Sequence, residues 1–172
     1  MFFCRWFCLG CLALFFTGQL SATTLESLSL DALVDHADLI VQVEIGESGT
    51  AFFDDQPHTL VEAAVEEVLK GAPISSITVA IPGGVIRPAA IPIEVEVVGA
   101  PQLFQGNRAI LFLEEFPGYG SLYRIVGFSQ GVFLFTTDGT NAVQDLRGLA
   151  AGDTMSVAAL KAEIRSTTEV AR

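Results

Sequence analysis

The spacing of hydrophobic residues predicts a chain of short β-strands between two helices. Near the start, hydrophobic residues recur at helical spacing over residues 30–36, and Ser29 precedes them as a helix cap. Near the end, Ser156 is the expected cap of a second helix, over residues 157–165. Between these helices, hydrophobic residues either alternate with polar ones or form short continuous runs, and both patterns are typical of strands.

About seven segments between the helices fit a strand pattern. They are residues 39–46, 59–69, 77–81, 91–98, 108–115, 122–129 and 132–136, followed by a short strand near Val143. The continuous hydrophobic run in 108–115 suits a strand that is buried on both faces. Residues 47–58 are expected to form a polar loop. We therefore expect a mainly β fold, namely a small, closed or partly open antiparallel barrel with a helix before and a helix after the strands.

The segment 59–71 fits two structures. As a helix, it begins with a capping box at Thr59, carries one hydrophobic face and ends at a glycine. As a strand, alternate residues from Val61 onward face the interior, and a bulge near Glu66 and Glu67 restores the alternation. Local periodicity alone favours the helix.

The first 22 residues have the pattern of a secretory signal peptide. Arg5 precedes an apolar run from Trp6 to Phe16, and smaller or polar residues follow up to Ala22. Because the run is about a dozen residues long and a spanning helix needs ~20, we expect cleavage after Ala22 rather than a membrane anchor. The predicted mature chain is a single domain, residues 23–172, exported to the periplasm or secreted and not stably inserted in a membrane.

Removal of this segment would leave a mature chain without thiols. All three cysteines of the sequence lie within its first 22 residues. The predicted mature chain therefore has no disulfide, no thiolate metal ligand and no cysteine nucleophile.

The charge of the chain limits its partners. The sequence has 20 acidic and 9 Lys or Arg residues, and its formal net charge is −11 at pH 7. Such a chain repels phosphate backbones, so we expect no nucleic-acid binding.

Short motifs mark the ends of the predicted strands. They are Ala37-Asp38, Val68 to Gly71, Gly83-Gly84, Val98 to Pro101, Gly106 to Arg108 and Gly131 to Phe133. In this order, over residues 28–164, they resemble a family of uncharacterised exported bacterial domains. The chain is also distantly similar to the oligonucleotide-binding-type (OB-type) barrels of netrin-like domains and tissue inhibitors of metalloproteinases.

This resemblance implies an OB-like barrel in which residues 59–69 form a strand, and we choose the strand over the helix for that reason. Tertiary pairing routinely overrides local propensity. The inhibitors' mechanism does not carry over, because it depends on an amino-terminal cysteine that chelates the protease zinc. Here the predicted mature chain begins at Thr23 and holds no cysteine.

One motif suggests a serine nucleophile. Residues 127–131 read Gly-Phe-Ser-Gln-Gly, the G-x-S-x-G pattern that places a serine on a strand-to-helix elbow with a histidine later in the chain. Here a predicted strand follows, and the two histidines of the sequence, His36 and His58, both precede Ser129. We interpret the motif as a bend between two strands and predict no catalytic residue.

Two further groups of polar residues are candidate sites. Asp54 and Asp55 beside His58 could hold a cation, but the spacing of the histidines fits no metal motif, and adjacent carboxylates usually mark a solvated turn. We predict no metal and no cofactor. Five glutamates could converge on one barrel face, although on alternating strands such residues more often form the solvated face: Glu62, Glu66, Glu67, Glu94 and Glu96.

Aromatic and amide side chains in or near loops are the candidates for contact with a partner. The predicted contact residues are Gln102, Phe104, Asn107, Phe52 and Phe53. Phe116, Tyr119 and Tyr123 also lie in or near loops, and all these aromatics could instead plug the ends of the barrel.

The function expected from these features is that of a non-catalytic binding or accessory module whose partner is another envelope or secreted protein. One alternative is an inhibitor-like module that applies the edge Gln102–Asn107 to a secreted protease. A hydrolase is the remaining alternative. The sequence leaves the oligomeric state open.

Overall fold

The computed structural model describes residues 27–86, 91–119, 121–145 and 154–170, and the predicted signal peptide lies outside them. The elements in chain order are α2 (Leu30–His36), β1 (Leu39–Phe53), β2 (Gln56–Lys70), β3 (Ser76–Pro82), β4 (Gly84–Ile86), β5 (Ile93–Val95), β6 (Arg108–Glu115), β7 (Leu122–Ile125), a 3-10 helix η2 (Phe128–Gly131), β8 (Val132–Phe135), β9 (Asn141–Gln144), β10 (Thr154–Ser156) and α3 (Val157–Val170). Neither of the two described α-helices combines the length and the hydropathy that crossing a bilayer requires.

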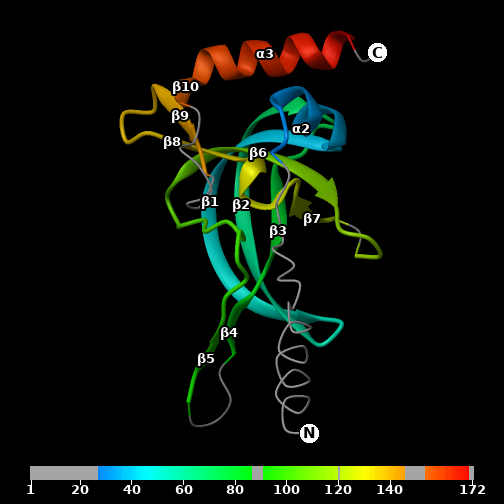
Figure 1. Ribbon diagram of the computed structural model, residues 1–172, viewed down its shortest axis with the longest axis vertical. Helices are drawn as coiled ribbons and strands as arrows, with labels where there is room; N and C mark the ends of the chain where they lie inside the picture. The colour runs from blue at the N-terminus through cyan, green and yellow to red at the C-terminus, as the bar shows by residue number, and fades with distance from the viewer. Residues whose placement is uncertain (1–26, 87–90, 120, 146–153, 171–172) are drawn as a thin grey trace, which may run out of the picture.

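The main sheet has eight strands and closes partly into a ring. Its order is β1-β2-β3-β7-β6-β8-β9-β10, and β1 also pairs with β6. The pairings β1–β2, β2–β3, β3–β7, β7–β6 and β6–β1 therefore return to their starting strand, while β8, β9 and β10 extend beyond the ring (Figure 1). The mainly β prediction with a helix at each end is confirmed.

The prediction of a purely antiparallel sheet is wrong at one pair. β3 and β7 run parallel, with Thr78 opposite Leu122 and Val79 opposite Tyr123. A parallel pair needs a long crossover, and the chain between these strands supplies it, because it includes β4, β5 and β6.

The segment 59–69 is part of strand β2, so the strand is confirmed and the helical alternative is wrong. Gln42 of β1 lies opposite Glu67, whereas the next residue, Val43, lies opposite Val65. Glu66 is therefore the extra residue of a bulge, at the place that the pattern predicted. Pairing with β1 along most of its length and with β3 over residues 58–64 stabilises this strand despite its helical periodicity.

The polar loop predicted for residues 47–58 is wrong, since all but two of these residues belong to β1 and β2. The two strands form one long hairpin that turns at Asp54 and Asp55, whose φ angles are 49° and 60°. Type I′ hairpin turns require positive φ at both central residues. The strands beside the turn are largely exposed, so their side chains carry no alternating hydrophobic pattern even though their backbones pair.

Several predicted boundaries shift. The strand expected over 91–98 is limited to Ile93–Val95, and with β4 it forms a separate two-stranded sheet, the arm, which projects from the main sheet (Figure 1). The strand expected over 122–129 ends at Ile125. The final helix continues beyond residue 165 to Val170.

Two hydrophobic cores flank β6. Ala109, Leu111 and Leu113 face the interior of the ring, whereas Ile110 and Phe112 face the second core beneath α2 and α3. The predicted burial of this strand on both faces is thus confirmed. The helices are capped as predicted: the Ser29 hydroxyl accepts from Ala32 N at 3.2 Å, and that of Ser156 accepts from Ala159 N at 3.1 Å.

Candidate functional site

Two rings from the β1–β2 hairpin and two from the β6–β7 loop pack together at the far end of the hairpin. They belong to Phe53, His58, Phe116 and Tyr119, and we call them the aromatic cluster. The Phe53 ring centroid lies 4.7 Å from that of Tyr119 and 5.2 Å from those of His58 and Phe116. Most of these contacts are edge-to-face, the geometry that the aromatic quadrupole favours.

The local backbone positions these rings. The Asp54-Asp55 turn brings Phe53 and His58 to adjacent strands of the hairpin. On the other side, Phe116 N donates to Leu122 O at 2.8 Å and Tyr119 N donates to Phe116 O at 3.2 Å, which closes a tight β6–β7 loop. Tyr119 remains 45% exposed, so the cluster is accessible to a partner.

A cavity of about 520 Å³ adjoins the aromatic cluster and shares His58 and Phe116 with it. We call it the aromatic-end cavity. Its apolar walls include Ala80–Pro82 of β3, Pro101 and Ile125. Its volume falls within the ~300–1,000 Å³ of small-ligand sites, which are mostly apolar with a few polar groups.

Two features of the aromatic-end cavity favour recognition over mere packing. Arg124 and Glu114 form an ion pair in its wall, with Nε and Oε1 2.8 Å apart. Phe128, also in the wall, has a φ of 58° and is 38% exposed. A bulky residue rarely adopts this left-handed conformation, and such strain concentrates at functional sites.

The predicted contact residues lie in two separate places. Phe53 belongs to the aromatic cluster, and Phe52 precedes it in the hairpin with 55% of its surface exposed. Gln102, Phe104 and Asn107 lie in the loop before β6, whereas Phe116 and Tyr119 follow that strand. The two groups are thus at opposite ends of β6.

The loop before β6 is held against β1. Gly106 N donates to Ile45 O and Ile45 N donates to Asn107 O, both at 2.8 Å. Phe104 is 60% exposed there. No aromatic ring contact involves Phe104 within the described part of the chain, so this loop has no counterpart of the aromatic cluster.

Sequence reasoning missed that His58, Phe116 and Tyr119 join Phe53. The sequence predicts a loop over residues 47–58. It therefore does not predict the β1–β2 pairing that brings the tip of the hairpin next to the β6–β7 loop. Loop aromatics at two distant positions were the available signal, but their meeting depends on long-range strand pairing.

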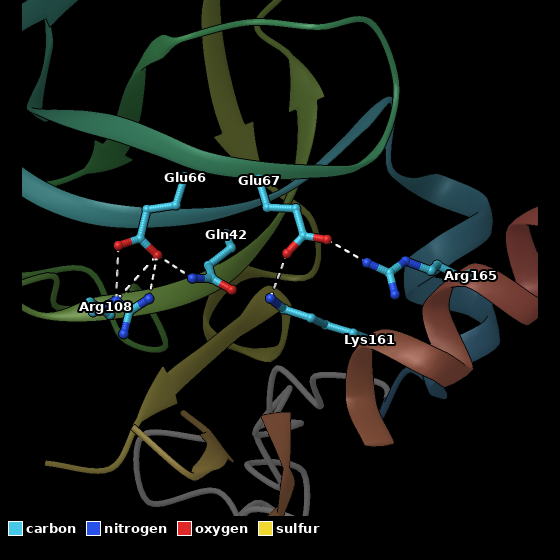
Figure 2. A network of polar contacts seen from close by, with 6 residues as sticks. All are labelled: Gln42, Glu66, Glu67, Arg108, Lys161 and Arg165. Atoms are coloured by element: carbon cyan, nitrogen blue, oxygen red, sulfur yellow. Dashed lines mark hydrogen bonds and ion pairs between the residues drawn. The ribbon is translucent and has the colours of Figure 1, made fainter. Parts of the chain in front are cut away.

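The five glutamates considered from sequence do not converge on one face, which agrees with the preference for solvated positions over an acid–base group. Glu66, at the bulge, pairs with Arg108 at 2.6 Å and accepts from Gln42, while Glu67 pairs with Lys161 at 2.6 Å and with Arg165 (Figure 2). Glu94 and Glu96 lie instead on the arm and in the segment that follows it.

These ion pairs lower the pKa of both carboxyls at the bulge. The hydrogen bond from Arg108 lowers the pKa of Glu66, and the hydrogen bond from Lys161 lowers the pKa of Glu67, each against an opposing effect of burial. Both groups are therefore charged at neutral pH and act as structural anchors, with Glu67 fastening α3 to β2 (Figure 2).

The candidate catalytic and metal-ligating residues do not lie together in one site. Ser129 is fully buried in η2, and its hydroxyl has no hydrogen-bond partner among the described residues. His36 ends α2, and His58 is in the aromatic cluster. In the described ranges, no three His, Cys, Asp or Glu side chains are placed to hold a metal ion.

Comparisons with known proteins leave the function to be inferred from this geometry. The resemblance to exported bacterial domains and netrin-like barrels stays a prediction. No protein-family model matches the chain, and no curated protein is significantly similar to it.

Proposed function

We propose that this chain is a non-catalytic binding module that contacts its partner through the aromatic cluster and the aromatic-end cavity. The observation that carries the proposal is the meeting of two rings of the β1–β2 hairpin with two rings of the β6–β7 loop, beside an apolar cavity of about 520 Å³. Aromatic residues are enriched in binding interfaces because each buries a large area at a low cost in conformational entropy.

We also propose that the ring β1-β2-β3-β7-β6 is an OB-like barrel. In OB folds, ligands contact strands 2 and 3 and the loops that join strands 1 to 2 and 4 to 5. Counted within the ring in chain order, those loops correspond to the β1–β2 turn and the β6–β7 loop. The aromatic cluster joins these two loops, which supports both the barrel assignment and the position of the binding surface.

The partner that suits this surface is a protein segment with apolar or aromatic side chains. The net charge of −11 disfavours oligonucleotides, the other ligands of such barrels. Together with the predicted signal peptide, this supports the proposal that the partner is an envelope or secreted protein.

The experiment is photo-crosslinking followed by affinity measurement. A photoreactive phenylalanine analogue at position 119 identifies the partner in envelope extract, and the affinity of the isolated partner is then measured for the parent chain and for variants. Tyr119→Ala should weaken binding by about tenfold or more, because truncation of an aromatic hot spot costs roughly 2 kcal/mol.

Phe104→Ala is the matched control. Phe104 is also an exposed aromatic, but it lies at the opposite end of β6. Its truncation should leave the affinity unchanged. Equal losses for the two variants, or a loss for Phe104→Ala alone, would move the binding surface away from the aromatic cluster.

A further inference from the structure

One edge of strand β1 is unpaired in the far part of the β1–β2 hairpin, which extends beyond the ring (Figure 1). β6 pairs with this edge only over Leu39–Glu44, and the loop before β6 holds it at Ile45. Over residues 46–53, β2 is the only described strand that pairs with β1. We call this stretch the open edge. Such an edge is a template for pairing with another strand.

The turn of the hairpin determines which backbone groups point out of the open edge. Phe53 and Gln56 lie opposite each other on either side of the two-residue turn, where a β-turn places a hydrogen bond. Along an antiparallel ladder, hydrogen-bonded pairs alternate with pairs whose N–H and C=O groups point away from the partner strand. The outward residues of the open edge are therefore Phe52, Thr50 and Ser48.

The residue opposite Phe52 supports this assignment. Pro57 has no N–H to donate to β1, and its carbonyl accepts from Gly83 N at 2.9 Å on the other side of β2. Phe52 and Pro57 are therefore a pair without mutual hydrogen bonds, and the backbone groups of Phe52 point out of the open edge.

The open edge lacks the features that usually prevent strand pairing, which are charged side chains, prolines and bulges. Residues 48–53 have no charge and no proline, and no register shift interrupts their pairing with β2. Ser48, Thr50 and Phe52 are exposed, and 55% of the surface of Phe52 is accessible. The arm contacts the face of the hairpin, where Thr50 Oγ1 donates to Val85 O at 3.2 Å, because strand side chains stand perpendicular to the ladder.

A second copy of the open edge is complementary to the first. When two β1 strands run antiparallel around a two-fold axis at Thr50, each Thr50 lies opposite the other, and Ser48 lies opposite Phe52 of the second copy. The outward residues of both copies then form hydrogen-bonded pairs, each of which exchanges two hydrogen bonds. A shift of the register in either direction leaves at least one outward residue without an outward residue opposite it.

The charges near the open edge also fit this register. Glu47 lies opposite Phe53 of the second copy, and Asp54 lies opposite Gly46, so no two carboxylates are directly opposed. At long range the two copies repel each other, because each has a formal net charge of −11 at pH 7. Added salt screens this repulsion, so it should strengthen the association.

We propose that the mature chain forms a two-fold dimer by antiparallel pairing of the open edges, centred on Thr50. The paired segments are short, so the dimer should be reversible and concentration-dependent. The proposal is independent of the partner assigned to the aromatic cluster. Phe53 belongs to that cluster, and consecutive strand residues such as Phe52 and Phe53 direct their side chains to opposite faces.

Single cysteines test the register, because the predicted mature chain has no native thiol. A hydrogen-bonded pair places its Cα atoms ~5.5 Å apart, within the ~4.4–6.8 Å that a disulfide spans. Under mild oxidation, Thr50→Cys should form a disulfide-linked dimer. Ser48→Cys alone should not, since Ser48 lies opposite Phe52 of the second copy. An equal mixture of Ser48→Cys and Phe52→Cys chains should form the mixed dimer.

Sedimentation equilibrium of two matched variants tests the role of the backbone. Thr50→Pro and Thr50→Val both lose the hydroxyl bond to Val85, but only proline also removes the outward N–H. Thr50→Pro should weaken the dimer by about tenfold or more, because both bonds of the central pair are lost. Thr50→Val and Tyr119→Ala should dimerise like the parent. Far-UV circular dichroism verifies that each variant folds, and the cysteine test does not depend on the proline variant.

Three results would overturn the proposal. A mature chain that stays monomeric at low and high salt would leave the open edge to an extended segment of a different protein. Cross-linking of Ser48→Cys as efficient as that of Thr50→Cys would contradict the two-fold register. A folded Thr50→Pro variant that dimerises as tightly as Thr50→Val would place the contact on another surface.

Discussion

Among the described glycines, Gly131 leaves the least room for a side chain. A Cβ there would lie 2.4 Å from Val126 O and 3.2 Å from Phe112 O, two backbone atoms that cannot move aside independently. Gly131→Ala should therefore destabilise the fold by about 2–3 kcal/mol, as overpacking of a core does. The free energy of unfolding in urea measures this change.

Gly49→Ala is the control for that substitution. No heavy atom lies within 4 Å of the added Cβ, and the residue is not in the left-handed region. Its stability should match or slightly exceed that of the parent, because alanine restricts the unfolded chain more than glycine does. Similar unfolding midpoints for the two variants would contradict the steric explanation.

The contribution of Asp138 to the stability of the fold depends on pH. Hydrogen bonds from Thr136 Oγ1 and then from the backbone and hydroxyl of Thr140 lower the pKa of its carboxyl from 3.8 to about 2. A depressed pKa means that the carboxylate stabilises the fold above pH 3.8, and that this contribution is lost as the pH falls toward about 2.

Asp138→Asn tests this linkage, because it keeps the shape of the side chain and removes its charge. Parent and variant should differ in stability at pH 7, and the difference should narrow between pH 3.8 and about 2. Urea unfolding at a series of pH values measures the gap. A difference that stays constant over that interval would show that the charge of the Asp138 carboxylate does not contribute to stability.

At the scale of elements, the ion pairs at the β2 bulge fasten the C-terminal helix. Glu67 reaches Lys161 and Arg165 of α3, while Leu160 and Ile164 of the same helix are fully buried. Glu67→Gln should destabilise the fold by about 0.5–1 kcal/mol, the range of a partly exposed ion pair, and should speed amide exchange in α3 more than in β6.

The pH dependence of this contact has a definite sign. Because the pKa of Glu67 is lowered below 4.5 in the folded state, its contribution is present above pH 4.5 and is lost as the pH falls through the lowered value. Glu163→Gln, in helix α3, is the control. Glu163 is exposed and forms no ion pair with any described residue. An equal loss of stability in both variants would show that the removal of a negative charge, not the contact of Glu67 with Lys161 and Arg165, is responsible.

Elements set by local pattern were predictable, and those set by pairing were not. The continuous run of β6 and the capped helix α2 follow from residues next to one another in the chain. Residues 47–53 become strand because they pair with β2, although none of them is buried and so no hydrophobic face marks them in the sequence. For residues 59–69, periodicity favours the helix, and the strand forms because β1 and β3 pair with it on both sides.

The difference between local pattern and long-range pairing also explains why the candidate site could be predicted only in part. Phe53 could be selected from sequence as a loop aromatic, but its contact with Phe116 and Tyr119 spans more than 60 residues. That contact depends on a ring in which β1 pairs with β6 and β3 pairs with β7. Hydrophobic periodicity describes the faces of strands and does not encode which strands become neighbours.

The ring also predicts where the molecule opens last. One edge of β6 pairs with β1 over Arg108–Leu113, and its other edge pairs with β8 and β7, so its backbone is enclosed on both sides. The arm has only three residue pairs between β4 and β5, and both strands are at least partly exposed. Amides of Ile110 to Phe112 should therefore exchange with solvent only through global unfolding, whereas arm amides should exchange through local opening. Native-state hydrogen exchange across a urea series distinguishes the two: the protection of β6 should fall in parallel with the global stability, and that of the arm should be lower and nearly independent of urea. Protection of the arm that equals that of β6 would mean that the arm unfolds as one unit with the ring, contrary to the independence that its sparse pairing predicts.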